Sequence, residues 1–443
     1  MERYDSYKDS GVDWMNKIPS NWEKSRIRMV GDLYGGLTGK KGSDFNDEDN
    51  SSNKPFIPFT NIFNNTYISK DYFQYVNVEE NENQNRVLKN DLFFLMSSES
   101  YEDLGKCSIL LEDVEELYLN SFCKGFRIKD SKVYPLFLNY QLLGSLHKEM
   151  ISIEGNGFTR INLRQNRLLD IPVFIPSLSE QRQIVSFLDT KTTLIDSLIE
   201  KTQQKIELLK EKRTSIINEV VTKGLNPKVE MKDSGVEWIG DIPSHWETTK
   251  FKFKGEVIIG LSYKPENQVD ENDGVLVMRS SNVQSGKPSF HDNVYVDCKI
   301  SDKLRTREGD ILICSRNGSR RLIGKNCLIT KEIEGMSWGV FMTMYRTPYY
   351  KFFYWLLNSP VFKSQSGLFL TSTINQLTVS TLENMVVPYV SDKIEQQQIV
   401  EYLDEQTGLI DNTISIEEKR IELLKEYRQS LISEVVTGKR KVV

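Results

Sequence analysis

One long helical stretch occurs twice in this sequence, and no other feature limits the possible folds as strongly. Residues 206–211, Ile-Glu-Leu-Leu-Lys-Glu, recur as residues 421–426, which lie 215 positions later. The same offset relates Glu180 to Glu395 and Thr222 to Thr437, so the match extends over the whole stretch. The chain therefore consists of two related halves, and each half ends in a copy of the same helix.

The spacing of the apolar residues indicates which kind of helix this is. They alternate between steps of four and three residues, which is typical of the narrow seam of a coiled coil rather than of a broad globular face. A helix from residue 179 to residue 222 would be about 66 Å long at about 1.5 Å per residue. The seam positions are Leu188, Ile195, Ile199, Ile206, Leu209, Arg213, Ile410, Ile414, Ile421, Leu424 and Arg428.

Each long helix also carries signals for its start and its end. Ser177 with Glu180, and Asp392 with Glu395, have the spacing of capping boxes, in which each side chain bonds to the other residue's backbone. Glycines follow at positions 224 and 438, where a left-handed residue commonly ends a helix.

Two arginines occupy seam positions, where they need carboxylate partners. Pseudo-twofold symmetry makes the helices antiparallel, and that register places Arg213 beside Asp411 and Arg428 beside Asp196. We therefore predict two symmetric ion pairs, which make both arginines tolerable in the seam.

Composition narrows the range of functions. The 443 residues are 39% hydrophobic and 27% charged, as expected of a multidomain globular protein, and no apolar run is long enough to cross a membrane. We therefore expect a cytoplasmic protein. The five cysteines include no Cys-x-x-Cys pair and the three histidines are isolated, so neither a metal site nor nucleophilic catalysis is indicated. The net charge of −5 argues mildly against nucleic acid, although local clusters of basic residues decide that question.

The two halves begin in the same way, because residues 8–23 return as residues 232–247. We interpret their tryptophans as anchors of the opening segments: Trp14, Trp22, Trp238 and Trp246. Short β-rich runs between polar loops follow in both halves, which predicts an α+β fold with two pseudo-symmetric mixed α/β domains separated by two long helices in an antiparallel coiled coil. The expected divisions are a first globular domain at 1–176, a first helix at 177–223, a second globular domain at 224–390, and a second helix with the C-terminal tail at 391–443.

These features together resemble one protein family over essentially the whole chain. The repeated opening segment, the Glu-Gln-x-x-Ile that follows a proline at each helix start, and the duplicated helix are similar to the specificity (S) subunit of type I restriction-modification enzymes. The two copies differ in one respect, since the spacer between the proline and Glu180 is shorter than the spacer before Glu395.

This resemblance implies a non-catalytic subunit with two target recognition domains, which recognises a split double-stranded DNA target with one domain per half-site. It implies two methyltransferase (M) subunits and two restriction (R) subunits as partners, for adenine methylation or cleavage. It also implies that this chain holds no cofactor, with S-adenosylmethionine on the methyltransferase subunit and ATP and Mg on the restriction subunit.

Polar and basic loop residues are the candidates for DNA contact, because arginine can recognise guanine and lysine can bind phosphate. In the first half these are Lys40, Lys41, Thr60, Asn61, Ser97, Ser98 and Arg160, and in the second half Tyr263, Lys264, Arg279, Ser280, Asn282, Arg316, Asn317, Arg320, Arg321, Lys325 and Asn375.

One aligned loop reverses its charge between the halves. Residues 97–104 read Ser-Ser-Glu-Ser-Tyr-Glu-Asp-Leu, whereas residues 316–323 read Arg-Asn-Gly-Ser-Arg-Arg-Leu-Ile. Arginine donates to guanine and glutamate accepts from cytosine, so we predict that the two halves recognise different half-sites.

A non-catalytic architectural coiled-coil module that bridges proteins is the alternative, and the acidic balance favours it slightly. Salt-dependent, sequence-selective DNA binding separates the two hypotheses.

Overall fold

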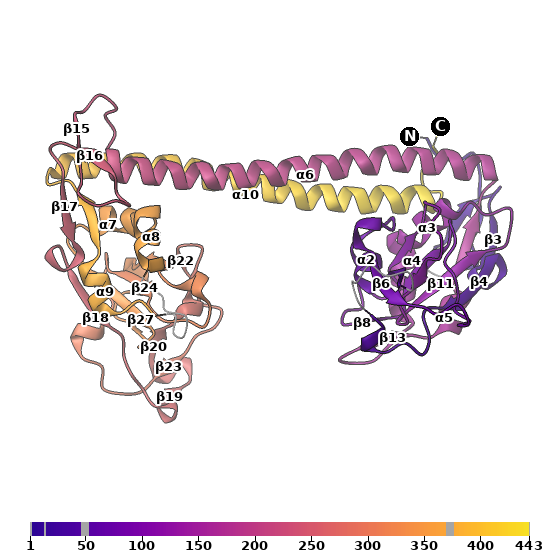
Figure 1. Cartoon of the computed structure of the whole chain (residues 1–443), viewed down its shortest axis with the longest axis horizontal. Helices are drawn as coiled ribbons and strands as arrows, with labels where there is room; N and C mark the ends of the chain where they lie inside the picture. The colour runs from indigo at the N-terminus through magenta and orange to yellow at the C-terminus, as the bar shows by residue number, and fades with distance from the viewer. Residues whose placement is uncertain (1, 13–14, 46–52, 369–375, 443) are drawn as a thin grey trace. The chain divides into compact units, whose positions relative to one another are not determined.

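The computed structural model describes residues 2–12, 15–45, 53–368 and 376–442, and the chain divides into two compact units. Unit 1 comprises Met1–Thr202 and Lys419–Val443, whereas unit 2 comprises Gln203–Glu418. Each copy of the duplicated stretch is one continuous helix, α6 (Leu178–Lys223) or α10 (Lys393–Val436), and each helix contributes to both units (Figure 1). No helix among the described residues is long and apolar enough to cross a membrane.

Unit 1 contains a four-stranded antiparallel sheet in the order β4-β11-β7-β9. The residues of β7 are all buried, which explains why their sequence is a continuous apolar run rather than an alternating one. Unit 1 also contains two three-stranded sheets, in the orders β10-β5-β6 and β12-β13-β8, and β10 is parallel to β5. The strands are β3 (Glu23–Arg26), β4 (Gly31–Gly35), β5 (Asn53–Ile57), β6 (Gln74–Asn77), β7 (Leu92–Leu95), β8 (Ser97–Ser98), β9 (Cys107–Ile109), β10 (Tyr118–Leu119), β11 (Cys123–Ile128), β12 (Gly155–Asn156), β13 (Ile161–Leu163) and β14 (Pro172–Ile175).

Short helices complete unit 1, and a proline at the first position begins the longest apolar one, α3. They are α1 (Ile27–Val30), α2 (Phe59–Asn64), α3 (Pro135–Leu143), α4 (Ser145–Ile153) and α5 (Gln165–Asp170).

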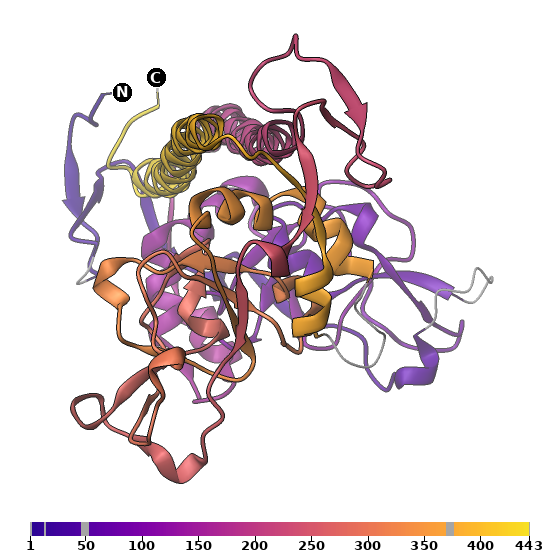
Figure 2. The same ribbon diagram turned by 90° about the vertical axis from the view of Figure 1, so that its left-hand side faces the viewer.

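Unit 2 repeats this plan with sheets β18-β27-β24-β25 and β19-β23-β20-β26, in which β26 is parallel to β20 as β10 is to β5. Strands β19 and β23 lie at the end of unit 2 that is remote from its parts of α6 and α10 (Figures 1 and 2). The strands are β17 (Glu247–Lys250), β18 (Glu256–Ile259), β19 (Gln268–Val269), β20 (Val275–Met278), β21 (Val283–Gln284), β22 (Lys287–Pro288), β23 (Tyr295–Val296), β24 (Ile311–Cys314), β25 (Asn326–Leu328), β26 (Ser337–Trp338), β27 (Met342–Arg346) and β28 (Val386–Tyr389).

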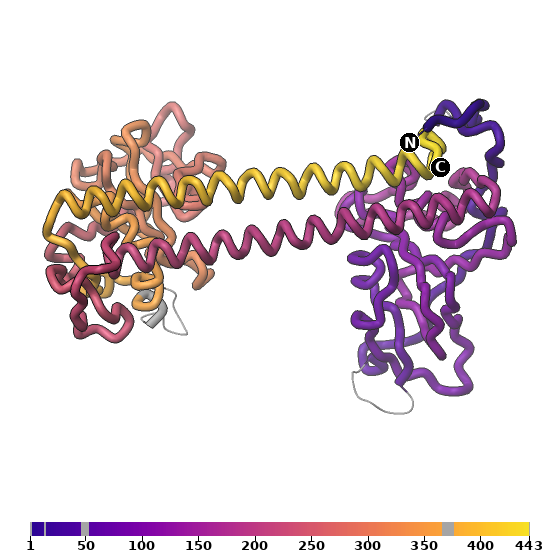
Figure 3. The backbone as a smooth tube through the Cα atoms, turned by 90° about the horizontal axis from the view of Figure 1, so that it is seen from above, coloured from indigo at the N-terminus to yellow at the C-terminus, as the bar shows by residue number. Residues whose placement is uncertain are grey.

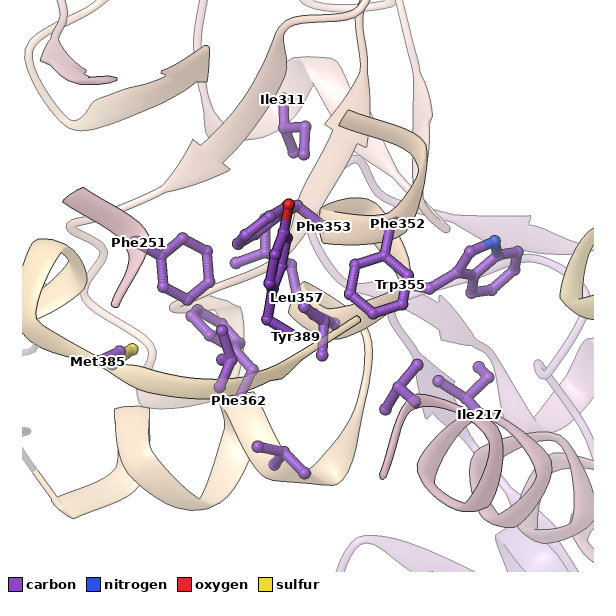
Figure 4. Close-up of a cluster of buried hydrophobic side chains, with 14 of the residues drawn as sticks. Ile217, Phe251, Ile311, Phe352, Phe353, Trp355, Leu357, Phe362, Met385 and Tyr389 are labelled. Carbon is purple, nitrogen blue, oxygen red and sulfur yellow. The ribbon is translucent and has the colours of Figure 1, made fainter. Parts of the chain in front are cut away.

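The main core of unit 2 joins its sheet to the long helices. Helices α7 (Tyr350–Leu357), α8 (Pro360–Leu368) and α9 (Val379–Asn384) surround a cluster rich in aromatic side chains. Trp355 of α7 and Ile217 of α6 belong to this cluster together with Phe251 and Tyr389 (Figure 4). Burial of such large side chains contributes about 1.5 to 3 kcal/mol each, so it fixes this part of α6 against the second globular domain.

Within each unit, the first half of one long helix packs against the second half of the other (Figure 3). In unit 1, Leu188 of α6 shares a core cluster with Leu431 and Val435 of α10. In unit 2, Ile217 of α6 shares a cluster with Leu403 of α10. Both pairings are antiparallel, as the sequence predicts.

Both opening segments form a two-stranded hairpin, β1 (Tyr7–Asp9) with β2 (Lys17–Pro19) and β15 (Met231–Asp233) with β16 (Asp241–Pro243). Trp22 and Trp246 follow these hairpins and are fully buried, which confirms the interpretation as anchors for these two. Trp238 is 43% exposed, so the interpretation is wrong for it, and Trp14 lies outside the described residues.

The two capping boxes are only half formed. The Glu180 N–H donates to Ser177 Oγ at 3.3 Å, and the Ile394 N–H donates to Asp392 Oδ1 at 2.8 Å. The carboxylates of the two glutamates turn to the tryptophans instead. The buried indole N–H groups of Trp22 and Trp246 donate to Glu180 at 2.9 Å and to Glu395 at 3.0 Å, respectively.

Candidate nucleic-acid interface

The central strands of each unit carry an ion pair with a buried aspartate at one end. Asp310 precedes β24, and its carboxylate accepts hydrogen bonds from Arg346 Nε at 2.7 Å and Nη2 at 2.6 Å. Asp91 precedes β7 and is bound in the same way by Arg127, at 3.0 and 2.6 Å. These bonds to the aspartates raise the pKa of both arginines above its ordinary value. The strand ends are therefore fixed to each other, and the loops at the opposite ends of the same strands start from rigid positions.

A cleft of about 830 Å³ lies at the opposite end of β24 and β27 in unit 2. It is formed by four chain segments that the fold brings together, residues 261–268, 279–281, 316–318 and 339–342. The described residues that line it include Arg279 and Arg316 but no aspartate or glutamate. Although the chain is acidic overall, this surface is suited to an anionic ligand.

Arg316 and Phe341 form the exposed part of the cleft. The backbone N–H of Arg316 donates to the Phe341 carbonyl at 3.0 Å, so the two residues sit on paired backbone. The guanidinium carbon lies 5.2 Å from the centre of the Phe341 ring, which is 54% exposed. No carboxylate among the described residues forms an ion pair with Arg316, so its donors remain available to a ligand.

Polar contacts join the two loops on either side of the cleft. The Asn317 amide donates to Ser280 Oγ at 3.0 Å, and Arg279 Nη2 lies 2.8 Å from Asp292. The ion pair with Asp292 offsets the charge of Arg279, whereas the hydrogen bond of Asn317 orders the loop. Tyr263 also lines the cleft, and Lys264 beside it is exposed.

The prediction that Asn282 contacts DNA is wrong. Its side chain is fully buried, and its amide donates to the Ser289 carbonyl at 2.9 Å and to the Asp292 carbonyl at 3.3 Å. The Arg279 N–H donates to its oxygen at 2.8 Å. Asn282 therefore shapes the loop that carries Arg279 and Ser280.

The other basic residues predicted in the second half do not line the cleft. Arg320 and Arg321 lie on a short, exposed 3₁₀ turn, and Lys325 is half-buried beyond it. Their role in DNA contact stays a prediction, and Asn375 lies outside the described residues.

Unit 1 has a matching arrangement around Phe122, which precedes β11 as Phe341 precedes β27. The Phe122 ring is 61% exposed, and the Arg160 guanidinium carbon lies 5.5 Å from its centre. Arg160 reaches this position from the residue before β13, and its Nε and Nη2 donate to Ser97 Oγ at 3.3 and 3.1 Å. Ser97 and Ser98 are themselves buried, so Arg160 is the exposed member of the predicted set here.

In unit 1 the prediction for Asn61 is wrong, whereas contact of Lys40 with DNA stays a prediction. Asn61 is fully buried, and its amide donates to the Ser69 carbonyl at 2.8 Å, as Asn282 does to its own loop. Lys40 forms an ion pair with Glu82, and the bond from Lys40 is the main cause that lowers the pKa of that carboxyl to about 2. Thr60 and Lys41 are exposed, and their contact with DNA stays a prediction.

The seam of the long helices agrees with the predicted register. Arg213 Nε lies 2.8 Å from Asp411 in unit 2, and Arg428 Nε lies 2.9 Å from Asp196 in unit 1, so both predicted ion pairs are confirmed. The seam residues that are fully or nearly buried are Leu188, Ile195, Ile206, Ile410 and Ile421, and those that are partly buried are Ile199, Leu209, Ile414 and Leu424.

Sequence reasoning missed Phe122 and Phe341. A signal for them exists, because they are related by the offset of 219 that also relates Asp91 to Asp310. Exposure was not visible in the sequence, where both phenylalanines look like ordinary strand residues.

Comparison with known proteins finds relatives that align with nearly the whole chain. Residues 19–208 match the family described as the type I restriction modification DNA specificity domain. The type I restriction enzyme MjaVIII specificity subunit of Methanocaldococcus jannaschii is 26% identical, over 98% of this chain and 97% of that protein. The EcoKI specificity subunit of Escherichia coli is also 26% identical, over 72% of this chain and 66% of that protein.

Two solved structures share the fold. One is a chain from a study of complex assembly and conformational transition of the type I R-M system, with a TM-score of 0.72 at 15% identity over 96% of this chain and 99% of that chain. The other is the HsdS subunit from Thermoanaerobacter tengcongensis, with a TM-score of 0.55 at 14% identity over 96% of this chain and 98% of that chain.

Proposed function

We propose that this chain, which belongs to the type I restriction-modification DNA specificity family, recognises a split double-stranded DNA target with one half-site for each unit. The observation that carries the proposal is the cleft of unit 2, whose lining among the described residues includes two arginines and no carboxylate, in a chain of net charge −5. Unit 1 supports it by presenting an arginine beside an exposed phenylalanine at the matching strand end.

Base recognition is the chemistry that these side chains can perform. A guanidinium group can donate two hydrogen bonds to O6 and N7 of guanine. Lys264 and Lys41 are exposed and suited to phosphate, which positions a protein on DNA without selecting a sequence.

Exposed apolar side chains on the long helices are the basis for the proposed partner binding. In unit 2, α10 exposes Tyr402, Leu409 and Ile416, which are 38%, 57% and 59% exposed and lie seven residues apart on one face. In unit 1, the counterpart of Leu409 is Leu194 on α6, which is 55% exposed. Exposed apolar side chains at heptad spacing favour a partner helix. Because Leu409 in unit 2 has the exposed counterpart Leu194 in unit 1, we infer two copies of the same partner, the methyltransferase subunit.

The chemistry of the complex would then belong to the partners. The methyltransferase subunits would bind S-adenosylmethionine and methylate adenine, and two restriction subunits would use ATP and Mg for cleavage. This chain would be non-catalytic and would supply the recognised sequence.

The proposal is tested by mapping methylated adenines in DNA that has been treated with this chain and its methyltransferase partner. We expect a bipartite motif, together with DNA binding that weakens steeply as salt is raised. Weakly salt-dependent binding without sequence preference would instead identify a protein-bridging module.

A variant pair sharpens the test. Arg316→Ala should relax one position of one half-site and weaken binding by about 1 to 3 kcal/mol. Arg307→Ala, which changes an exposed arginine outside the cleft and outside the predicted contact set, is the matched control and should leave that position unchanged. A uniform loss over all sequences would make Arg316 a phosphate contact.

A further inference from the structure

Phe122 and Phe341 occupy the same place in their units. Phe341 follows β26 and precedes β27, and Phe122 follows β10 and precedes β11. In each unit the preceding short strand is parallel to its partner and the following strand is antiparallel to its neighbours. The phenyl rings are therefore equivalent in topology as well as in sequence offset.

The rings of Phe122 and Phe341 are exposed although each is followed in the chain by a buried residue. The residues that follow them, Cys123 and Met342, are buried, yet Phe122 and Phe341 are 61% and 54% exposed. Leaving a phenyl ring in water forgoes part of the about 1.5 to 3 kcal/mol that its burial would contribute. Retention of this arrangement in both units points to a ligand that covers the rings.

Each ring has an arginine beside it, but the two arginines come from different segments. In unit 2 it is Arg316, from the loop after β24, and in unit 1 it is Arg160, from the residue before β13. Ser97 occupies the sequence position equivalent to Arg316, and its hydroxyl accepts hydrogen bonds from Arg160. The same pair of side chains is thus assembled in two ways.

The spacing within the pair is long enough for the two side chains to reach neighbouring bases of a DNA strand. The guanidinium carbon lies 5.2 or 5.5 Å from the ring centre, and bases on one strand are about 3.4 Å apart along the helix axis. An arginine that binds O6 and N7 of guanine in the major groove would therefore place its phenyl partner against the adjacent base. Phenylalanine makes apolar contact with the 5-methyl group of thymine, which projects into the same groove.

We propose that each phenylalanine-arginine pair recognises one step of thymine and guanine, with arginine on the guanine and phenylalanine on the thymine methyl group. This inference rests on the proposed function and deepens it, because it specifies one base step in each half-site. It applies to Arg160 with Phe122 in one half-site and to Arg316 with Phe341 in the other.

The test uses the complex of the full chain with its methyltransferase partner and duplexes that carry its mapped target. Thymines are replaced one at a time by uracil, which lacks only the methyl group, and binding is measured at each position. We expect one sensitive thymine beside a guanine in each half-site, with about fourfold weaker binding after replacement. Replacement of that guanine by 7-deazaguanine, which lacks the N7 acceptor, should also weaken binding.

Variants assign each step to its pair. Phe341→Ala should abolish the uracil effect in one half-site and Phe122→Ala in the other, while each leaves the opposite half-site unchanged. Phe253→Ala is the matched control, because Phe253 is 69% exposed and has Lys252 Nζ 5.4 Å from its ring centre but does not line the cleft. Unfolding curves of the three variants should coincide with that of the parent chain, since all three rings are exposed.

Several results would overturn the inference. The first is a half-site in which no thymine lies beside a guanine. The second is binding that does not change when thymine is replaced by uracil. The third is a phenylalanine variant that weakens binding to every sequence equally. Insertion of the rings between base pairs would give the second result, because it does not depend on the methyl group. Loss of all sequence preference in the parent complex would instead refute the proposed function, so the two failures are distinguishable.

Discussion

Removal of the Asp310 carboxylate should both destabilise unit 2 and disturb its cleft. Asp310→Ala leaves the Arg346 guanidinium, whose side chain is 19% exposed, without its bidentate partner, and removes the acceptor of the Arg307 N–H at 2.9 Å. Breaking a buried ion pair by removal of one partner costs about 3 to 5 kcal/mol. For a domain of about 200 residues this lowers the melting temperature by about 6 to 20 °C, at about 2 to 4 °C per kcal/mol.

The effect on recognition follows from the strand register. Asp310 and Arg346 lie at one end of β24 and β27. Arg316 and Phe341 lie just beyond the opposite end of the same two strands. Loosening the first end should therefore weaken selection in the half-site of unit 2 and leave that of unit 1 intact.

Calorimetry and methylation mapping of the same variant provide the assay. Glu256→Ala is the control, because it removes the exposed ion pair with Lys303 in the same sheet, and exposed pairs contribute about 0 to 1 kcal/mol. A cost for Asp310→Ala no larger than that of the control would refute the reasoning. Equal loss in both half-sites would refute the link to the cleft.

Three further outcomes are expected. Arg213→Ala and Arg428→Ala should each cost about 0.5 to 1 kcal/mol in urea unfolding, because their carboxylate partners Asp411 and Asp196 are about half exposed; exchange of the charges within a pair should restore stability. Burial lowers the pKa of His147 from 6.5 to about 4, so between these values the unfolded chain binds a proton that the folded chain does not. Stability should therefore fall by about 1.4 kcal/mol per pH unit as the pH drops through that window, and His147→Gln should lack this slope in urea unfolding at each pH. Finally, one heptad inserted at equivalent positions of α6 and α10 adds about 10 Å, and mapping should show a longer gap between unchanged half-sites; altered half-sites would contradict the proposed function.

The helical part of the fold was predictable because it depends on local periodicity. Counting in steps of four and three residues gives the seam, and pseudo-symmetry then fixes which positions oppose each other. That reasoning placed Arg213 beside Asp411 without any knowledge of the globular domains. No long-range information was required, since each half of the helix pair repeats the other.

The loops were less predictable, because burial decides the role of a polar side chain. Asn61 and Asn282 have the same sequence signature as residues that contact DNA, but both are closed inside their own loops. The predicted capping boxes are only half formed for a related reason. A buried indole N–H needs an acceptor, whereas a backbone N–H at an exposed helix start can bind water, so Glu180 bonds to Trp22, 158 residues away in sequence.

The charge reversal between residues 97–104 and 316–323 has a different meaning in the structure than in the sequence. In the sequence it contrasts an acidic loop with a basic one. In the structure, the position of Arg316 is taken in unit 1 by Ser97, and Arg160, the residue before β13, brings a guanidinium group to that serine. The arginine is therefore kept, although the segment that carries it has changed.

What differs between the units is the charge around this shared pair. Glu99 and Glu102 are exposed on the loop of unit 1, where unit 2 has the exposed Arg320 and Arg321. A carboxylate accepts from the amino group of cytosine and is repelled by phosphate, whereas arginine binds guanine or phosphate. Because the arginine and the phenyl ring are common to both units, we expect a difference between the two half-sites to arise from surrounding residues such as these. A loop that tolerates such a reversal without a change in length is suited to acquiring new target sequences.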